Sequence, residues 1–299
     1  MKRKKSEKNR KKRNRVILLL CLILGVVWWN KNDDSEIKQA FSYVKSEVEQ
    51  RMSKDNDNIY EVKAPKTMNE EEIEETLGEL AAQDKQFEAI YEDRKQYPIE
   101  VLSALCNNPE MVSFVKDYLN GEKTQRGGIN NEELAADIPL LLQWDARWGY
   151  APYGESNIGM SGCAPTCLSM VVVGLTKQKA ATPYAIAKYA TEQGYYLKGT
   201  GTSWSLMTEG SMAYNVCGKE ICLDKSIMMN ELEAGHPIIC SVREGDFTTQ
   251  GHFIVLTGIK EGKITVNDPN STYRSKKLWD YDCLAGQIKN LWAFSKIED

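Results

Sequence analysis

The spacing of apolar residues divides the chain into three stretches. Residues 16–29 form one unbroken apolar run. Between residues 69 and 120, apolar side chains recur every three or four positions, as in Ile73, Leu77 and Leu80, which is the period of an amphipathic helix. This pattern predicts a small helical module built from four segments: 70–82, 86–94, 99–106 and 109–119.

From Ile138 onwards the apolar runs are shorter, and their order along the chain predicts the fold class. Two buried helices are predicted at 166–175 and 184–193. Strands follow at 237–242, 253–259 and 264–266, the last two as a hairpin across Glu261-Gly262. Helices followed by strands indicate an α+β domain rather than alternating βαβ units. We therefore predict a helical module at 69–120, a linker at 121–137 and an α+β domain at 138–299.

The N-terminal region predicts a membrane anchor. Residues 1–15 hold ten Lys/Arg and one Glu, whereas residues 16–29 hold no charge. A helix of that length covers about 21 Å, so flanking arginines would have to snorkel to span a hydrocarbon core of about 30 Å. Basic residues stay on the cytoplasmic side. We expect a cytoplasmic tail at 1–15, a single transmembrane signal-anchor over Val16–Trp29, a stalk at 30–68 and an extracellular body.

A cleaved signal peptide is the alternative interpretation of this segment. It requires small residues at a cleavage site after the apolar run. The run instead ends in Trp28-Trp29, followed by polar residues. Tryptophan prefers the membrane interface, so this ending favours an uncleaved anchor.

Charge and composition exclude several classes of function. The overall charge is only −4, but the tail carries +9, so the rest of the chain carries −13. An acidic body argues against a nucleic-acid partner. The chain has two histidines, no CxxC pair and no GxxxxGK[ST] loop, so a three-histidine zinc site and a phosphate-binding loop of that kind are ruled out. We expect no metal and no cofactor.

The segment Ser161–Val171 contains a candidate nucleophile. Proline is tolerated in the first turn of a helix, so Pro165 places the helix start near Cys163. The helix dipole and the free N–H groups at that end stabilise a thiolate. Cys167 lies one turn further in and lacks this advantage. The alternative is that Cys163 is a small core residue or half of a disulfide.

A nucleophilic cysteine needs a base, and the chain offers only His236 and His252. His236 lies in a Gly-His-Pro turn, whereas His252 begins an apolar strand that would hold it rigidly. The next strand ends in Asn267-Asp268, so Asp268 is the candidate for orienting the imidazole, with Asn267 in reserve. A strict two-residue hairpin would turn Asp268 away from His252, so this triad requires an odd loop or a β-bulge.

Gln143 completes the constellation, because a side-chain amide upstream of the nucleophile can stabilise an oxyanion together with the backbone N–H of Cys163. The chain order Gln, Cys, His, Asp resembles that of papain-type thiol hydrolases. A narrower resemblance, to cysteine-peptidase family thirty-nine, rests on five motifs. These are Gln143-Trp144-Asp145-x-Arg147-Trp148-Gly149, Gly162-Cys163-x-Pro165-Thr166, Gly199-Thr200-Gly201-Thr202-Ser203-Trp204, Gly251-His252-Phe253-Ile254-Val255-Leu256 and Asn267-Asp268-Pro269.

This family is the bacteriocin-processing type that cleaves after double-glycine leaders, and the chain is most similar to its stand-alone members without the transporter. The resemblance implies a papain-like fold, a peptide or protein substrate, Cys163 as nucleophile, His252 as base, Asp268 as acid and Gln143 as oxyanion donor. One departure is Ala164, where the family usually has glycine. We expect its methyl group to narrow the cleft.

Two functional alternatives stay open at this point. A cell-wall peptide amidase or endopeptidase would use the same thiol chemistry. A peptidase-like domain that binds peptides without cleaving them would retain the fold alone. Two structural questions also stay open: the oligomeric state, and whether Cys217 and Cys222 form a disulfide in an oxidising compartment or are free thiols.

Overall fold

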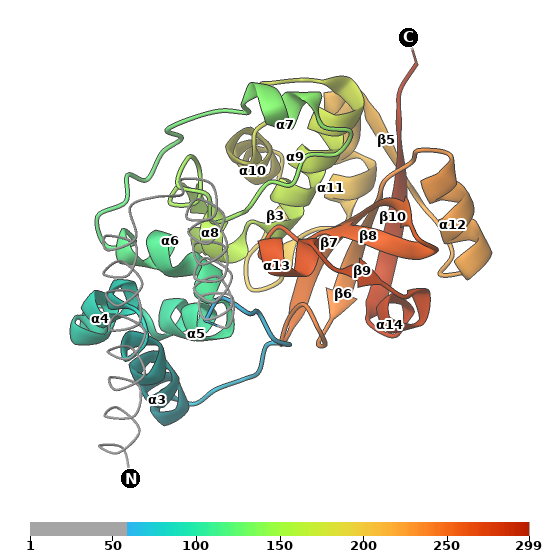
Figure 1. The fold of residues 1–299 in the computed structure, drawn as a ribbon. Helices are drawn as coiled ribbons and strands as arrows, with labels where there is room; N and C mark the ends of the chain where they lie inside the picture. The colour runs from blue at the N-terminus through green and yellow to red at the C-terminus, as the bar shows by residue number, and fades with distance from the viewer. Residues whose placement is uncertain (1–58, 299) are drawn as a thin grey trace, which may run out of the picture. The chain divides into compact units, whose positions relative to one another are not determined.

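The computed structural model describes residues 59–298, which belong to one compact unit (Figure 1). The predicted basic tail, the membrane anchor at 16–29 and most of the stalk lie outside these residues. Within residues 59–298, no helix has both the length and the apolar character that crossing a membrane requires.

The helical module consists of α3 (Glu70–Ala81), α4 (Lys85–Glu92), α5 (Ile99–Asn107) and α6 (Val112–Lys116). Helix α3 starts in a capping box, in which the Asn69 side chain accepts from the Glu72 N–H and the Glu72 carboxylate accepts from the Asn69 N–H. Short 3-10 turns at Arg94–Gln96 and Pro109–Met111 separate the later helices. The four predicted helical segments are therefore present, the last one split by its 3-10 turn.

The module has its own apolar core, which includes Leu77, Phe87 and Ile90. At the end of the predicted stalk, Met68 belongs to this core, and Ile59 and Tyr60 pack against it. Val62, in the same segment, is also buried. Tyr150 of the following domain belongs to the same cluster, so the module and the α+β domain share packing.

The predicted linker carries a short helix, α7 (Asn131–Ala135), and is tied to the domain by Arg147. The Arg147 guanidinium donates to both Glu133 and Asp145, and it also lies over the Trp148 ring. These contacts explain why a segment with little apolar content still follows one path over the domain.

The helical layer of the α+β domain centres on α9 (Cys163–Thr176), which is almost completely buried. It packs against α10 (Pro183–Glu192) and against the sheet. Three shorter helices, α8 (Ile158–Ser161), α11 (Ser205–Thr208) and a 3-10 helix at Gly210–Tyr214, complete this layer. Two small ladders flank the layer: β1 (Pro152–Tyr153) with β2 (Ser156–Asn157), and β3 (Tyr196–Leu197) with β4 (Gly201–Thr202).

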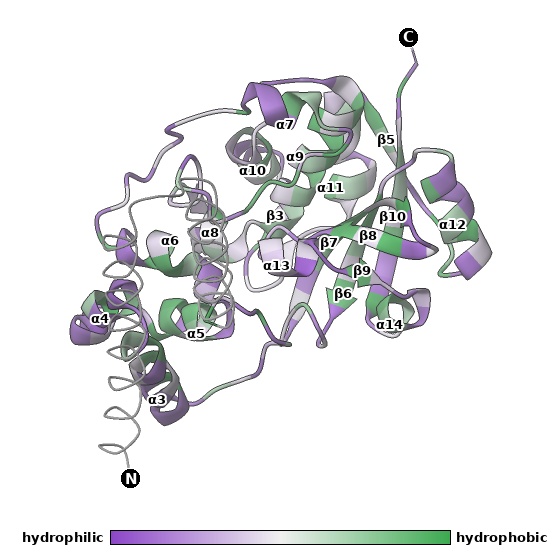
Figure 2. Cartoon of the chain, in the orientation of Figure 1, coloured by the Kyte–Doolittle hydropathy of each residue, from purple (hydrophilic) through white to green (hydrophobic). Residues whose placement is uncertain are grey.

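The sheet has six strands in the order β5-β10-β6-β7-β8-β9, and every neighbouring pair is antiparallel. One core cluster combines α9 with Phe253 and Val255 of β7, and a second combines Ile254 and Leu256 of β7 with α12 (Lys225–Glu233). The sheet therefore has an apolar core on each face, and its central strands are coloured as hydrophobic in Figure 2. The six strands are β5 (Val216–Glu220), β6 (Ile238–Arg243), β7 (Gly251–Lys260), β8 (Lys263–Asn267), β9 (Leu278–Trp279) and β10 (Ile288–Lys296).

Mixed helices and an antiparallel sheet confirm the predicted α+β class. The chain between β8 and β10 forms α13 (Thr272–Ser275) and α14 (Tyr281–Ala285), and α13 immediately follows the segment that carries Asp268. Figure 1 shows α13 close to the end of β8, on the side of the sheet that faces the helical module.

The β7–β8 hairpin contains the bulge that the sequence required. Its loop is a two-residue turn at Glu261 and Gly262, both with positive φ. The register then shifts, because Gly258 pairs with Thr265 but Leu256 pairs with Val266, which leaves Thr257 as the extra residue. Without this shift Asp268 would fall opposite Val255. With it, Asn267 pairs with Val255, so the position of Asp268 falls opposite Ile254, on the same face as His252.

Candidate active site

Cys163 is the first residue of α9, directly after Gly162, and its side chain is only partly buried. Residues that follow Pro165 pack into the core, so the helix is fixed along its whole length and its N-terminus points into a cleft. The amide groups of the first turn have no intrahelical partners and therefore favour negative charge at this end.

His252 lies opposite this helix at the start of β7, where it is 7% exposed. Its Nε2 is 2.8 Å from Oδ1 of Asp268, which is fully buried. Because the carboxylate occupies Nε2, Nδ1 is the ring atom left to exchange a proton in the cleft. The structure thus brings His252 and Asp268 together, and the β7–β8 bulge makes this contact possible.

Charges around this pair stabilise its ionised form. Burial lowers the pKa of His252, but the charge and hydrogen bond of Asp268, with a contribution from Cys163, outweigh it and raise that pKa to about 9. Burial also raises the pKa of Asp268, but Arg274 and His252 outweigh it and lower that pKa to about 2. At neutral pH the pair is therefore an imidazolium and a carboxylate.

Arg274 is the member of this site that the sequence did not reveal. It lies in α13 and is 2% exposed, and its Nε donates to Oδ2 of Asp268 at 2.5 Å. Its Nη2 is buried, with no hydrogen-bond partner in the described part of the chain. The sequence carried no signal for this contact, because the role depends on burial and on the turn of α13 rather than on a motif.

Gln143 is 5% exposed and lies at the same cleft. Its Nε2 donates to the carbonyl of Gly159 at 2.8 Å, which fixes the amide and leaves a second N–H hydrogen on that nitrogen. Its backbone N–H donates to the carbonyl of Pro269, next to Asp268, at 2.8 Å. The predicted oxyanion donor is therefore held from two sides.

Asn267, the reserve candidate for the acid, has a different role. Its Nδ2 donates to the carbonyls of Ile138 and Pro139, both at 3.1 Å. It therefore ties the start of the domain to the end of β8, and of the two candidates Asp268 is the one that hydrogen-bonds His252.

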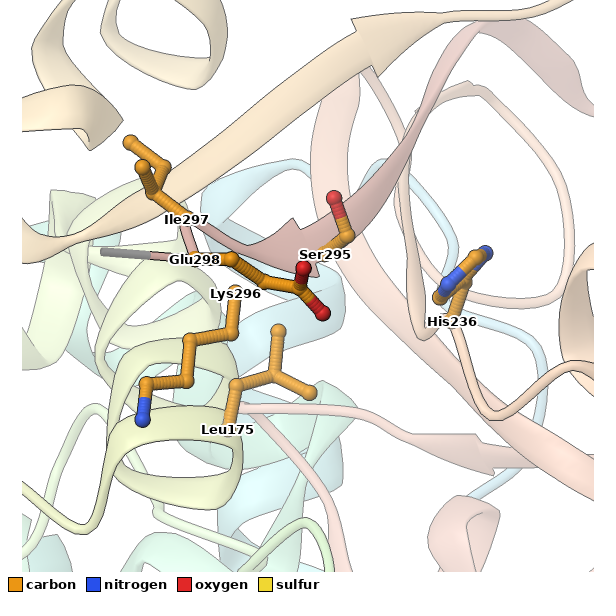
Figure 3. Close-up of a pocket in the computed structure, with 6 residues that line it drawn as sticks. All are labelled: Leu175, His236, Ser295, Lys296, Ile297 and Glu298. Atoms are coloured by element: carbon orange, nitrogen blue, oxygen red, sulfur yellow. The ribbon is translucent and has the colours of Figure 1, made fainter.

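The other candidate thiol and the other histidine lie outside this arrangement. Cys167 is buried, and burial together with nearby negative charge raises the pKa of its thiol well above the usual value. His236 pairs with Glu231 at 2.7 Å and borders a separate hollow of about 450 Å³ near Leu175 and the end of β10 (Figure 3). No member of the Cys163 site lines that hollow.

The site opens into a cleft of about 1050 Å³ that brings together distant parts of the chain. Trp204 lines it and packs edge-on against Trp292, with ring centroids 5.6 Å apart. Most of the lining residues are uncharged, both polar and apolar, and part of the lining comes from the helical module. That part comprises Glu100, Ser103, Ala104, Asn107 and Asn108.

Two sequence-based points are now resolved. Ala164 is fully buried in the core cluster and does not line the cleft, so the expectation that its methyl group narrows the cleft is wrong. The side chain at the second position of α9 points inward when the first faces the cleft. Cys217 and Cys222 are both free and exposed.

Comparison with known proteins identifies the family of the chain. The model of the Peptidase_C39 like family matches residues 135–296. The match covers more than half of the chain, so the chain belongs to this family, and the predicted resemblance is confirmed. It includes the whole constellation from Gln143 to Asp268 but none of the helical module. No curated protein matches the chain.

Proposed function

We propose that this protein is a thiol peptidase that hydrolyses peptide bonds through Cys163, His252 and Asp268, with Gln143 as the oxyanion donor. One observation carries the proposal: a partly exposed cysteine at a helix N-terminus shares a cleft with a histidine whose Nε2 is held by a buried aspartate. A helix-borne thiol facing a sheet-borne histidine is the papain-like arrangement, which we propose for the fold.

The mechanism follows from the atoms available. The Cys163 thiolate attacks the peptide carbonyl carbon, and the Cys163 N–H and the free Nε2–H of Gln143 stabilise the oxyanion. The imidazolium of His252 gives the Nδ1 proton to the leaving amine, which leaves a thioester on Cys163. Neutral His252 then takes a proton from water, whose oxygen attacks the thioester. The acid product departs and the thiolate–imidazolium pair is restored.

Family membership supports a peptide or protein substrate. We further propose that the body is extracellular and anchored by residues 16–29, which rests on the charge pattern of the sequence alone. A cell-wall peptide amidase or endopeptidase is the second candidate, supported by the absence of charge from most of the cleft lining. Cleavage of a linear peptide library, compared with cleavage of cross-linked cell-wall peptides, separates the two.

The first test measures the reactivity of individual cysteines. The purified, reduced full chain is alkylated with iodoacetamide at about pH 5, and each cysteine is quantified by mass spectrometry. Cys217 is free and exposed, so its rate of alkylation is the internal reference. We expect Cys163 to react at least about tenfold faster than Cys217.

The matched variants are Cys163→Ala and Cys167→Ala, and His252→Ala against His236→Ala. Peptide hydrolysis should disappear in the first member of each pair and persist in the second. A folded chain in which Cys163 reacts no faster than Cys217, with no hydrolysis of either substrate class, would show a binding domain rather than a peptidase.

A further inference from the structure

The loop that carries Asp268 is held from outside the family-matched part of the chain. Glu110 lies in the 3-10 turn of the helical module, and its carboxylate reaches the start of α13. It accepts from the Ser271 hydroxyl at 2.6 Å, from the Thr272 hydroxyl, and from the Tyr273 N–H at 3.2 Å. One carboxylate thus engages three consecutive residues, which lie more than 160 positions away in sequence.

Asn108 provides a second attachment beside the first. It is 2% exposed, its Nδ2 donates to the carbonyl of Asn270, and its Oδ1 accepts from the Glu110 N–H at 3.2 Å. Trp144 also donates to the Asn270 carbonyl, at 2.9 Å. The module therefore contacts both Asn270, two residues before α13, and the start of α13 itself.

The same short loop holds the catalytic carboxylate on its inner side. The Asn270 N–H donates to Oδ1 of Asp268 at 2.8 Å, and the Asp268 N–H donates to the Ser275 hydroxyl at 2.9 Å. Oδ1 is also the atom that contacts His252. Asn270 therefore links the two sides directly: its carbonyl accepts from the module, and its N–H donates to the catalytic carboxylate.

We propose that Glu110 and Asn108 are positioning residues for the catalytic acid, so that the helical module is a working part of the active site rather than an attached accessory. This inference rests on the proposed function. Glu110 does not line the cleft, so it acts only through the loop. Removing the Glu110 carboxylate removes the acceptor shared by Ser271, Thr272 and Tyr273 at the start of α13. The loop is then held less tightly, so the Asp268 carboxylate is less well fixed relative to the His252 ring.

The first measurement requires no substrate. The full chain carrying Cys163→Ala is labelled with [¹³C]histidine, and its NMR spectrum contains the signals of two histidines. The signal that disappears in the additional variant His236→Ala belongs to His236, and the other belongs to His252. The His252 titration then reports how closely Asp268 is held, because a neighbouring opposite charge shifts a pKa by about 1–3 units. We expect Glu110→Ala to lower this pKa by about one unit, and Asn108→Ala by less.

The matched control is Glu74→Ala, which removes another module carboxylate, one that pairs with Arg94 at 2.5 Å. It should leave the His252 titration unchanged. A loss of stability alone would lower the melting temperature of a variant without moving the titration of a residue in its folded state. Glu110→Gln, which keeps one acceptor oxygen, should lie between wild type and Glu110→Ala.

The second measurement is steady-state hydrolysis, with Cys163 intact. Small misplacements of catalytic groups cost up to about 100-fold in rate, so Glu110→Ala should lower kcat about 10- to 100-fold while KM changes less than about twofold. Unchanged kcat and an unchanged His252 titration in folded Glu110→Ala would overturn the proposal. If Glu110→Ala does not fold, the His252 titration and kcat are measured on Asn108→Ala instead, and unchanged values there would overturn the proposal.

The two proposals fail in different ways. A wild-type chain that shows no Cys163-dependent hydrolysis removes the peptidase proposal, whereas the NMR titration in the Cys163→Ala background still decides whether the module positions Asp268. If hydrolysis is lost in Cys163→Ala but its rate is unchanged in Glu110→Ala and Asn108→Ala, only the positioning role is refuted.

Discussion

The pKa of the His252 imidazole depends on several neighbouring groups of the site, with Asp268 and Cys163 among them. The imidazole is buried, yet it contacts a buried carboxylate and shares the cleft with a thiol at a helix N-terminus. A neutral imidazole would lower the cost of its own burial but would leave Asp268 with one cationic partner, Arg274. The observed partners favour the charged ring, which is the form that can donate a proton to a leaving amine.

This arrangement predicts how stability depends on pH. The folded-state pKa of His252, about 9, lies above the ordinary value of 6.5. Its charge therefore stabilises the fold fully below pH 6.5, and this contribution is lost as pH rises through 9; it amounts to at most about 3 kcal/mol. We expect urea unfolding to show a large gap between wild type and His252→Gln at pH 6, and a much smaller gap at pH 10.

The contribution of Asp268 to stability changes with pH in the opposite direction. The pKa of Asp268 is about 2 in the fold against an ordinary 3.8, so its contribution is present above pH 3.8 and disappears as pH falls towards 2. For the His252 prediction, the contradicting result is an equal difference in unfolding free energy between wild type and His252→Gln at pH 6 and pH 10. Such a result would mean that the His252 ring is not charged in the folded protein.

The contact between His252 and Asp268 could be predicted because the alternatives were few. The chain has two histidines, and Cys163 is the cysteine that lies at a proline-marked helix start. Arg274 could not be predicted, since its contact depends on how α13 turns back over Asp268. The inward direction of Ala164 also depends on tertiary packing, because a helix start does not say which of its first side chains faces the cleft.

Among the elements, the segment between β8 and β9 has the greatest influence on the site. It carries Asp268, it receives Glu110 at the start of α13, and it contributes the buried Arg274. The β7–β8 bulge then sets which face this segment approaches. The bulge could be predicted, because the number of residues between His252 and Asp268 has the wrong parity for a regular hairpin.

The Arg274–Asp268 ion pair gives a prediction for this segment. Replacing Arg274 by Met leaves a buried carboxylate with one fewer positive partner, so we expect a loss of about 3–5 kcal/mol in the free energy of unfolding at pH 7. The double variant Arg274→Met/Asp268→Asn should recover much of that loss, because the uncompensated charge is gone. Additive losses in a denaturant-based double-mutant cycle would show that the two side chains contribute independently.

For the whole molecule, the helical module and the α+β domain share one interface. Phe114 of α6 stacks on Tyr150 with centroids 4.7 Å apart, and the Tyr150 hydroxyl donates to the Phe114 carbonyl at 3.1 Å. The sequence predicted a small helical module before the α+β domain. It could not show that the module contacts the loop that carries Asp268, because nothing in the sequence around Glu110 marks that contact.

This interface predicts the effect of truncating Phe114. Phe114→Ala should cost about 3–5 kcal/mol of unfolding free energy, because the side chain is buried between two elements. Loosened packing should also increase proteolytic cleavage within residues 117–130 under native conditions. Exposed Ser113 supplies the control, and Ser113→Ala should match wild type in denaturation and proteolysis. Equal cleavage in Phe114→Ala and wild type would mean that other contacts hold the module.

The hydrogen bond from the Gln143 N–H to the Pro269 carbonyl has a consequence for the proposed site as a whole. It joins the backbone of the proposed oxyanion donor to the residue next to Asp268. A displacement of the Asp268 loop is therefore transmitted to the backbone of Gln143, so that a disturbance on the histidine side of the cleft also reaches the amide side.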